Sequence, residues 1–341
     1  MSTISIIIPH YNGYDILNNC LRSLYKSKLY NAEIIIVNNN STDNSIDKNQ
    51  SEFPEIIILN LDHNKGYAGG CNYGATHANG EFLVFLNNDT EVSVDWLTEL
   101  MKTINNDTNI SSVQPKILNK KNETEFDYAG ASGGFIDKYC YPFARGRIFN
   151  TIEKDLGQYN DSIKVFWASG TGFITRKSLF KDIGGFDEQL FAHMEEIDYH
   201  WKCQLKGYSV YINPTSTIYH LGGETLSYNS PYKTYLNHRN SLLLLLSNYN
   251  MSNSIKFLFP RLFMELTSTV KDLLSLRFLH SLAQLRAIGW IIIHPQIISN
   301  RRAVIKKIRK ISDEELLGNT IFSKSIVYQY FINNKKEYSS L

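Results

Sequence analysis

Three carboxylates stand within four residues of one another, at Glu195, Glu196 and Asp198. The apolar residues that follow them recur at helical spacing, so we expect the three acids at the start of a helix. Favourable interaction with the helix macrodipole accounts for one or two of them. Repulsion among the acids raises the pKa of a carboxyl group, and a group that exchanges its proton near neutral pH is suited to general acid–base chemistry.

Polar residues also follow three apolar runs in the N-terminal part of the chain. These clusters are Pro9-His10-Tyr11-Asn12, residues 38–43, and Asn87-Asn88-Asp89. Turns and helix caps explain any one of them, but three together indicate a ligand site. A glycine-rich segment at residues 64–74 lets the backbone approach a ligand closely. It lacks the G-x-G-x-x-G spacing, which disfavours a dinucleotide-dependent oxidoreductase.

The polar clusters must be positioned by the elements that precede them. Short runs of β-branched, aliphatic and aromatic residues predict strands at 4–8, 34–37, 56–59 and 82–86. Segments with helical spacing separate these runs, as at Leu17, Leu21 and Leu24. This alternation predicts a parallel sheet covered on both faces, whose ligands bind at the carboxyl ends of the strands.

These motifs together resemble those of family 2 inverting glycosyltransferases, which have the GT-A fold. The later motifs are Gly184-Gly185-Phe186-Asp187-Glu188, Glu195-Glu196-Ile197-Asp198 and Tyr219-His220-Leu221-Gly222-Gly223. The resemblance covers about residues 3–245 and is specific as a combination. It implies an α/β fold with a Rossmann-like, mainly parallel sheet, here followed by a C-terminal α-helical extension. Arg239-Asn240, after Tyr235, is similar to a rhamnosyltransferase subgroup.

The resemblance implies that Asp89 binds a divalent ion, Mg²⁺ or Mn²⁺, and that His220 completes the site. Such an ion stabilises the charge that develops on a nucleoside diphosphate leaving group. The alternatives are that Asp89 caps a helix containing residues 94–100 and that His220 is a satisfied core histidine. Gly222 and Gly223 would let a loop bend back over a ligand.

Among the three acids, the resemblance assigns Glu196 as the general base that deprotonates the acceptor hydroxyl. Asp198 is the next candidate, with the alternative that it orients the helix or holds an acceptor hydroxyl. Glu195 completes the set of candidate catalytic residues. The implied mechanism has no covalent intermediate, so the anomeric configuration inverts.

The nucleotide-sugar site implied by the resemblance begins with Pro9 and Tyr11, which flank the base and ribose. Asn38 stands where the family commonly has an aspartate that reads the pyrimidine, which leaves the choice between uracil and thymine open. The remaining residues of this group are Asn64 as a ribose or phosphate contact, Asn87 and Asn88 in the strand-end motif, and Trp167 beside the sugar. Core packing explains Trp167 equally well.

Charge is divided unevenly along the 341 residues, whose net charge is only +2. Residues 236–311 carry +10, and the rest of the chain about −8. We therefore expect a glycosyltransferase domain at 1–235, with a nucleotide-sugar half at about 1–115 and an acceptor half at about 116–235. The basic remainder, 236–341, is expected to form amphipathic helices, starting near Ile255.

The basic helical extension suggests a membrane-surface platform. Residues 301–310 hold six basic residues, and basic stretches beside amphipathic helices bind anionic lipid. The alternative is a solvated helix face. The longest uncharged apolar-rich stretch in this part, 287–300, is too short to span a bilayer. No nucleic-acid module accompanies the charge, so nucleic acid is not expected as a partner.

The composition is that of a globular protein, with 43% hydrophobic and 20% charged residues. The four cysteines form no C-x-x-C pair, and we expect them to be reduced. No secretory leader is recognised at the start of the sequence. These features predict a cytoplasmic enzyme, peripheral at the inner face of the membrane; its oligomeric state is left open.

The sequence thus predicts an inverting glycosyltransferase. Its donor would be a dTDP- or UDP-linked sugar, with dTDP-rhamnose as one candidate. Its acceptor would be a lipid-linked or surface-polysaccharide glycan. Two alternatives stay open, a catalytically inactive scaffold that binds sugar nucleotides or glycans, and a sugar-1-phosphate nucleotidyltransferase. Asn38 and Asn87, each in place of an expected aspartate, make the scaffold conceivable.

Overall fold

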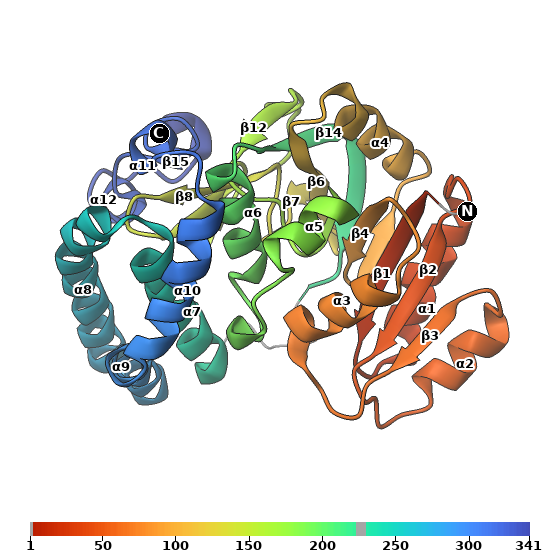
Figure 1. Ribbon diagram of the computed structural model, residues 1–341, viewed down its shortest axis with the longest axis horizontal. Helices are drawn as coiled ribbons and strands as arrows, with labels where there is room; N and C mark the ends of the chain where they lie inside the picture. Colours follow the sequence, from red (N-terminus) through yellow and green to blue (C-terminus); the bar gives the residue numbers. More distant parts are fainter. Residues whose placement is uncertain (1–2, 223–229) are drawn as a thin grey trace.

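We analysed a computed structural model of the chain, in which residues 3–222 and 230–341 are described. A central sheet runs through the molecule with helices on both faces, and a helical bundle stands at one end (Figure 1). The strand order is β12-β14-β6-β13-β4-β1-β2-β3, with β5 paired to β14 and β7 to β6. This confirms the expected GT-A-type α/β fold with a helical C-terminal part.

Four strands form the parallel half of the central sheet. They are β1 (Ile4–His10), β2 (Glu33–Asn38), β3 (Ile57–Asn60) and β4 (Phe82–Leu86). All four expected strands are present: β4 has the expected bounds, and the ends of the other three differ from the expectation by no more than two residues. Because β1 pairs in parallel with both β2 and β4, the carboxyl ends of these strands open onto the same edge of the sheet.

The other half of the sheet is mixed. Its strands are β5 (Thr90–Val92), β6 (Ile110–Asn119), β7 (Asn122–Phe126), β12 (Ile163–Val165), β13 (Gly172–Arg176) and β14 (Ser209–His220). β13 is antiparallel to β4 and β6, whereas β14 is parallel to β6. The end of β14 pairs with β5, where His220 lies opposite Thr90. This pairing brings His220 beside Asp89, although 131 residues separate them in the chain.

Alternate residues of the strands supply two hydrophobic cores, because successive side chains of a strand point to opposite faces. Ile6 and Ile8 pack against one group of helices, and Ile7 packs against another. The first group is α1 (Tyr14–Lys26), α2 (Ser45–Glu52) and α4 (Trp96–Asn106). The second group is α3 (Gly66–His77), α5 (Lys177–Ile183) and α6 (Glu195–Leu205).

Helix α6 is buried on nearly all sides. Tyr199 and Cys203 pack on the central sheet, whereas Trp201 and Leu205 belong to a third core that includes the C-terminal helices. The helix that begins with the three predicted acids therefore lies between the sheet and the bundle (Figure 1).

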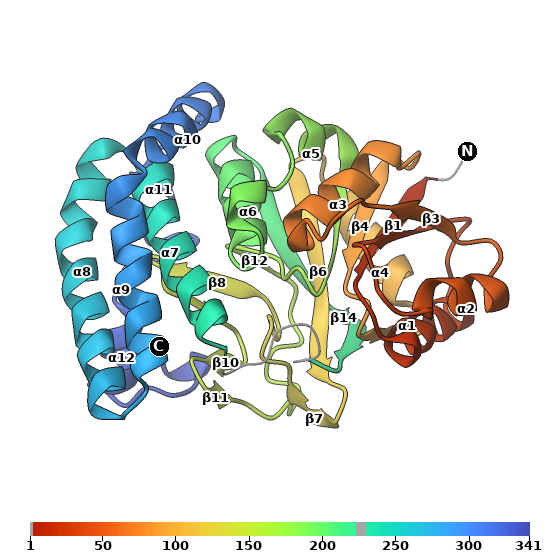
Figure 2. The ribbon, with the colours of Figure 1, turned by 90° about the horizontal axis from the view of Figure 1, so that it is seen from below.

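The C-terminal part forms a helical bundle followed by short elements. Its members are α7 (Pro231–Asn248), α8 (Met251–Leu274), α9 (Phe278–Ile293), α10 (Pro295–Ile308), α11 (Asp313–Leu316), β15 (Ile321–Phe322), α12 (Ile326–Phe331) and the 3-10 turn η2 (Tyr338–Ser340). Helices α8 and α9 lie side by side on the outside of the bundle (Figure 2). The expected boundary between residues 235 and 236 falls inside α7.

A second sheet joins the two parts of the chain. It has the order β11-β10-β9-β8-β15, with β8 (Gly134–Asp137), β9 (Pro142–Ala144), β10 (Arg147–Ile148) and β11 (Thr151–Ile152). The C-terminal segment returns to this sheet, because β15 pairs with β8.

The basic run at 301–310 is only partly exposed to solvent. Arg301 forms ion pairs with both Asp187 and Asp198, and Arg309 forms one with Asp313. Arg302 donates a hydrogen bond to the carbonyl of Leu246. The lysines of the run, Lys306, Lys307 and Lys310, are exposed. Of the helices within the described ranges, none combines the length and the apolar character needed to cross a bilayer.

Candidate active site

A cavity of about 1540 Å³ opens at the carboxyl ends of the parallel strands and extends to the helical bundle. The predicted site residues that line it are Pro9, Tyr11, Asn64, Asn87, Asn88, Asp89, Trp167, Glu195, Glu196 and His220. Asn38 and Asp198 do not line it. The fold thus gathers ten of the twelve predicted residues around one space.

Asp89 and His220 lie together in the wall of this cavity. Asp89 Oδ1 is 3.2 Å from His220 Nε2, and both side chains are buried. On the far side of the ring, Nδ1 is 2.9 Å from the carboxylate of Asp127. Burial alone would lower the pKa of His220, but Asp89 and Asp127 outweigh it and raise the pKa to about 10.

Helix capping does not explain Asp89. Helix α4 begins at Trp96 with Asp95 as its N-cap, and Asp89 immediately precedes β5 instead. The alternative that Asp89 caps the helix at residues 94–100 is therefore wrong. Gly222 follows His220 closely, whereas Gly223 lies outside the described residues.

The Asp89–His220 pair suits a divalent ion that is shared with a ligand. Asp89 Oδ1 is buried, and apart from its 3.2 Å contact with His220 Nε2 it has no hydrogen-bond partner in the described part of the chain. Between residues 3–222 and 230–341, no three His, Cys, Asp or Glu side chains form a complete metal site. Mg²⁺ in nucleotide sites commonly takes one or two protein ligands and completes its shell with phosphate oxygens and water. One carboxylate and one imidazole fit that pattern.

Glu195 and Glu196 begin α6 and both line the cavity. Burial raises the pKa of Glu196 to about 7, with interactions from the backbone of Glu196 and Ile197 acting in the opposite direction. The pKa of Glu195 lies well above its usual range, because of its burial and the neighbouring charge of Glu196. The two groups titrate as a coupled pair, in which the pKa of Glu195 is raised well above its usual range and that of Glu196 is raised to about 7.

The loop before α6 is strained where it presents these acids. Phe191, His193 and Met194 have φ values of 62°, 67° and 75°, a region that non-glycine residues rarely adopt. Strain of this kind persists only where the surroundings fix it, and it is common at functional sites. Gly66, itself at φ 69°, packs against the loop so closely that a Cβ would lie 2.5 Å from the carbonyl oxygen of Phe191.

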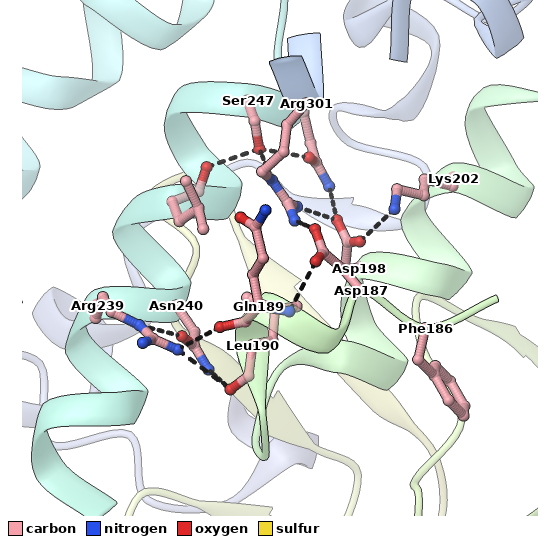
Figure 3. A network of polar contacts seen from close by, with 12 residues as sticks. Phe186, Asp187, Gln189, Leu190, Asp198, Lys202, Arg239, Asn240, Ser247 and Arg301 are labelled. Carbon is pink, nitrogen blue, oxygen red and sulfur yellow. Dashed lines mark hydrogen bonds and ion pairs between the residues drawn. The ribbon is translucent and has the colours of Figure 1, made fainter. Parts of the chain in front are cut away.

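Two side chains of α7 hold this loop in place (Figure 3). Arg239 donates to the carbonyls of Gln189 and Leu190. Asn240 Nδ2 lies 2.7 to 3.1 Å from three carbonyl oxygens, those of Leu190, Ala192 and His193. In this chain the Arg239–Asn240 pair thus supports the loop before α6.

Asp198 faces away from the cavity, into the interface between α6 and the bundle (Figure 3). It forms ion pairs of 2.6 Å with Lys202 and with Arg301, and it accepts a hydrogen bond from Asn248. Burial alone would raise the pKa of Asp198, but Arg301 and Lys202 outweigh it and lower the pKa to about 2. These contacts match the alternative in which Asp198 orients the helix.

His10, which sequence reasoning did not single out, links two of the polar strand ends. Its Nδ1 is 2.8 Å from Asn88 Nδ2, and its Nε2 is 2.8 Å from Ser45 Oγ. Burial lowers the pKa of His10 to about 4, so the ring is neutral. Nδ1 then accepts from Asn88, and Nε2–H donates to Ser45. His10 therefore fixes the side chain of Asn88.

The other predicted ligand contacts have varied surroundings. Tyr11 is 42% exposed, whereas Trp167 is 3% exposed and donates from its indole nitrogen to the carbonyl of Phe135. Asn64 Oδ1 accepts from the backbone of Gly66. Asn38, at the end of β2, donates a hydrogen bond from Nδ2 to Asn60 and accepts one at Oδ1 from the backbone N–H of Ser41.

Several cavity residues carried no sequence signal strong enough to find them. Two of them, Tyr128 and Arg147, come from the irregular stretch between β7 and β12, which has no recognisable motif. Asp127, which contacts His220 but does not line the cavity, comes from the same stretch. His10 did stand inside one of the polar clusters, next to Pro9. Its neighbours across the sheet could have been inferred only from the pairing of β1 with β2 and β4.

Comparison with known proteins agrees with this geometry. Residues 5–184 match the family model described as Glycosyl transferase family 2. The chain is 26% identical over 263 residues to the low-salt glycan biosynthesis hexosyltransferase Agl10 of Haloferax volcanii, covering 75% of this chain and 78% of that protein. It is 27% identical over 235 residues to a poly-beta-1,6-N-acetyl-D-glucosamine synthase of Staphylococcus aureus. That match covers 65% of this chain and about half, 51%, of the synthase.

Solved structures with low sequence identity share the fold. The structure of S. aureus TarS 1-349 in complex with UDP-GlcNAc has a TM-score of 0.59 at 18% identity, covering 90% of this chain and 91% of that one. GalNAc-T7 with UDP, GalNAc and Mn²⁺ has a TM-score of 0.55 at 17% identity, covering 76% and 54%.

Proposed function

The chain belongs to glycosyl transferase family 2, and we propose that it moves a sugar from a nucleoside-diphosphate donor to a glycan hydroxyl with inversion. The observation that carries this proposal is the content of one cavity. Glu196, which ionises near neutral pH, lines the same space as Asp89 and His220. A base for the acceptor and a site for the leaving group therefore face one ligand.

The donor is proposed to lie along the ends of β1 and β4. Pro9, Tyr11, Asn64 and Asn88 line this part of the cavity, and the exposed ring of Tyr11 is available to stack on a base. The structure of S. aureus TarS 1-349, which shares the fold, was solved in complex with UDP-GlcNAc. We propose a UDP- or dTDP-linked sugar here, with dTDP-rhamnose among the candidates.

We propose that Asp89 and His220 hold a divalent ion, Mg²⁺ or Mn²⁺. When bound, the ion would supply positive charge to the departing diphosphate. Asp127 accepts from the opposite ring nitrogen of His220 and so fixes which nitrogen faces the ligand. GalNAc-T7 was crystallised with Mn²⁺ and shares this fold.

Glu196 is proposed to take the proton of the attacking hydroxyl. Its Oε2 is buried and lacks a hydrogen-bond partner among the described residues, so it is free to accept one from a ligand. As the proton moves to Glu196, the acceptor oxygen bonds to the anomeric carbon and the bond from that carbon to the diphosphate oxygen breaks on the opposite face. The pKa of Glu195 is raised well above its usual range by burial and by the charge of Glu196, which disfavours a second negative charge beside the nucleophile.

The acceptor is proposed to be lipid-linked or a surface polysaccharide, reached at a membrane surface. Apolar residues on the outside of α8 and α9 are exposed, including Phe259, Leu266, Val270, Leu274, Leu279 and Leu282. Large apolar side chains exposed together on one helix pair favour an interaction site there. Arg277 and Arg286 lie on the same helix pair, and Lys306, Lys307 and Lys310 follow, so an anionic membrane is a suitable partner.

The proposal is tested by nucleoside-diphosphate release. UDP-, dTDP- and GDP-sugars are each incubated with lipid-linked acceptor extract, with and without Mn²⁺, using wild type, Glu196→Gln and the matched surface variant Glu81→Gln. We expect release from one donor that requires Mn²⁺ and acceptor, is abolished by Glu196→Gln and is unchanged in Glu81→Gln. Nucleotide binding without any release would favour the scaffold, and pyrophosphate production from a nucleoside triphosphate would favour the nucleotidyltransferase.

A further inference from the structure

Arg147, in β10, is a buried arginine that forms no close ion pair in the described part of the chain, although the charge of Asp127 acts on it. Its side chain lines the cavity, yet the residue is only 7% exposed. Its Nε is buried and has no hydrogen-bond partner there. The guanidinium stacks on the ring of Tyr128, with Cζ 4.7 Å from the ring centroid. Burial holds the pKa of Arg147 below its ordinary value.

The other buried arginines of the described residues show what a structural role requires. Arg145 forms an ion pair with Asp161, and Arg261 forms one with Glu265. Arg301 forms ion pairs with both Asp187 and Asp198. Arg239 donates hydrogen bonds to two backbone carbonyls. Each therefore compensates the loss of its hydration with fixed acceptors, as buried charges must. Among the described residues no hydrogen bond or ion pair joins Arg147 to such an acceptor, and Arg147 differs from the other four in this respect.

A second cation faces the same ring. Lys233, near the start of α7, lies with its Nζ 5.8 Å from the centroid of Tyr128 and also lines the cavity. Burial, followed by the charge of Arg147, lowers the pKa of Lys233. Burial, followed by the charge of Lys233, lowers the pKa of His193, which lies in the loop before Glu196. Arg147 and Lys233 therefore carry like charges that act on each other within one cavity, and an anion bound there would be attracted by both.

We propose that Arg147 and Lys233 bind an anionic group of the acceptor, a phosphate or a carboxylate, close to the hydroxyl that Glu196 deprotonates. This inference rests on the proposed function and names the class of acceptor. Arg147 and Lys233 come from β10 and α7, and the charge of Lys233 acts on His193 in the loop before α6, the helix that begins with Glu195 and Glu196. The donor diphosphate already has Asp89 and His220 at the ends of β4 and β14. A planar guanidinium suits bidentate binding of either kind of anion.

The test compares three sugars with the same ring. Glucose 6-phosphate, glucuronate and glucose carry a phosphate, a carboxylate and a neutral group at the same position. Their dissociation constants are measured by ligand-observed NMR at constant ionic strength, with the donor site filled by a nucleoside diphosphate and Mg²⁺. We compare wild type, Arg147→Gln, Lys233→Gln and Arg22→Gln, a surface arginine variant on α1 that serves as the matched control. Circular dichroism confirms that each variant is folded.

We expect at least one anionic sugar to bind wild type about tenfold more tightly than glucose, and Arg147→Gln to remove this preference. Lys233→Gln should reduce it, and Arg22→Gln should leave it unchanged. Which of the two anions binds more tightly identifies the acceptor group as phosphate or carboxylate. If Arg147→Gln does not fold, Lys233→Gln decides the question.

Two results would overturn the proposal. One is equal affinity of wild type for all three sugars. The other is an Arg147→Gln variant that keeps its preference for anionic sugars but binds the nucleoside diphosphate about tenfold more weakly, which would assign Arg147 to the donor. Because nucleotide affinity is measured separately, a protein that binds no nucleotide contradicts the proposed function instead.

Discussion

Arg301 in α10 forms a buried ion pair with Asp198 in α6, with Nη2 and Oδ1 2.6 Å apart. Asp198 lies two residues after Glu196, on the helix that carries both catalytic candidates. Arg301 also pairs with Asp187, which precedes the strained loop (Figure 3). A residue of the C-terminal bundle therefore holds two segments of the candidate active site at once.

Loss of this arginine should destabilise the protein. Arg301→Gln leaves the carboxylates of Asp187 and Asp198 with fewer partners, and breaking a buried pair typically costs about 3–5 kcal/mol. Lys202 still neutralises part of the charge of Asp198, so we expect the lower end of that range. Urea denaturation measures the loss, with the exposed Lys306→Gln as control. A difference from Lys306→Gln of less than about 1 kcal/mol would contradict the importance of the pair.

The central sheet was predictable because its signals are local. Continuous apolar runs at β1, β2 and β4 and the polar residues after them gave the strand ends, and parallel pairing brings such ends together. The same logic placed Asp89 at the site. His220 required the resemblance, because its partner strand β5 is only three residues long.

The roles of charged residues were less predictable, because the role of a charged side chain depends on the residues that contact it in the folded protein. Asp198 and Glu196 look alike in sequence, but only the packing of α10 against α6 shows that Asp198 faces Arg301. For the same reason the basic run 301–310 could not be divided into its internal arginines and its exposed lysines. Arg147 lies in a stretch of short strands without periodicity, so nothing in the sequence indicated that it would line the cavity.

The pH dependence of activity should follow Glu196. Its pKa is raised to about 7 by burial, and only the ionised form accepts a proton. We expect kcat/KM to rise as the pH passes from 6 to 8, measured by nucleoside-diphosphate release. A flat profile over this range, with chemistry shown to be rate-limiting, would rule out Glu196 as the base.

Stability should respond to the same group in the opposite direction. Between pH 4.5 and about 7 the native protein holds a proton on Glu196 that the unfolded chain has lost. The contribution of this group to stability is therefore present at low pH and falls as the pH rises through that window. Glu196→Gln removes this contribution, so the stability difference between wild type and Glu196→Gln should change with pH by about 1–3 kcal/mol across it.

Asn240 should prove essential for the loop before α6. In Asn240→Asp a carboxylate replaces an amide that faces three carbonyl oxygens, so donors are lost and acceptors face one another. We expect a loss of stability of about 2–3 kcal/mol and a fall in kcat of about tenfold or more, with donor affinity little changed. Asn300→Asp, on the exposed face of α10, is the matched control. Equal kcat values for the two variants would contradict the role of Asn240.

Asp127 should act on the metal site through His220. Asp127→Asn keeps the size of the side chain but weakens the bond to Nδ1, which is 2.9 Å long. Loss of such a partner typically reduces metal affinity by about 10- to 100-fold. We therefore expect the Mn²⁺ concentration for half-maximal activity to rise by that factor, with kcat largely recovered at saturating Mn²⁺. Mn²⁺ binding measured by electron paramagnetic resonance should show the same shift. An unchanged Mn²⁺ affinity would exclude Asp127 as a positioning residue.

Binding to lipid should depend on the outer surface of α8 and α9. Leu274 and Leu279 are 78% and 66% exposed, so replacing both with serine removes apolar area without opening the core. Burying two leucine side chains in a membrane contributes about 3–6 kcal/mol, which is enough to change the bound fraction markedly. We expect wild type to float with vesicles that contain anionic lipid, and Leu274→Ser/Leu279→Ser to remain in the soluble fraction.

The matched control for this experiment is Leu156→Ser, because Leu156 is 84% exposed but lies outside the helical bundle, between β11 and β12. It should float like wild type. Equal flotation of the double variant and of Leu156→Ser would contradict the membrane-surface platform. If wild type also floats with neutral vesicles, apolar contact suffices for binding, and the exposed lysines of α10 and its C-terminal end contribute little. Because Leu274 and Leu279 do not line the cavity, nucleotide binding should be unchanged in the double variant, which separates a defect in membrane attachment from a defect in the active site.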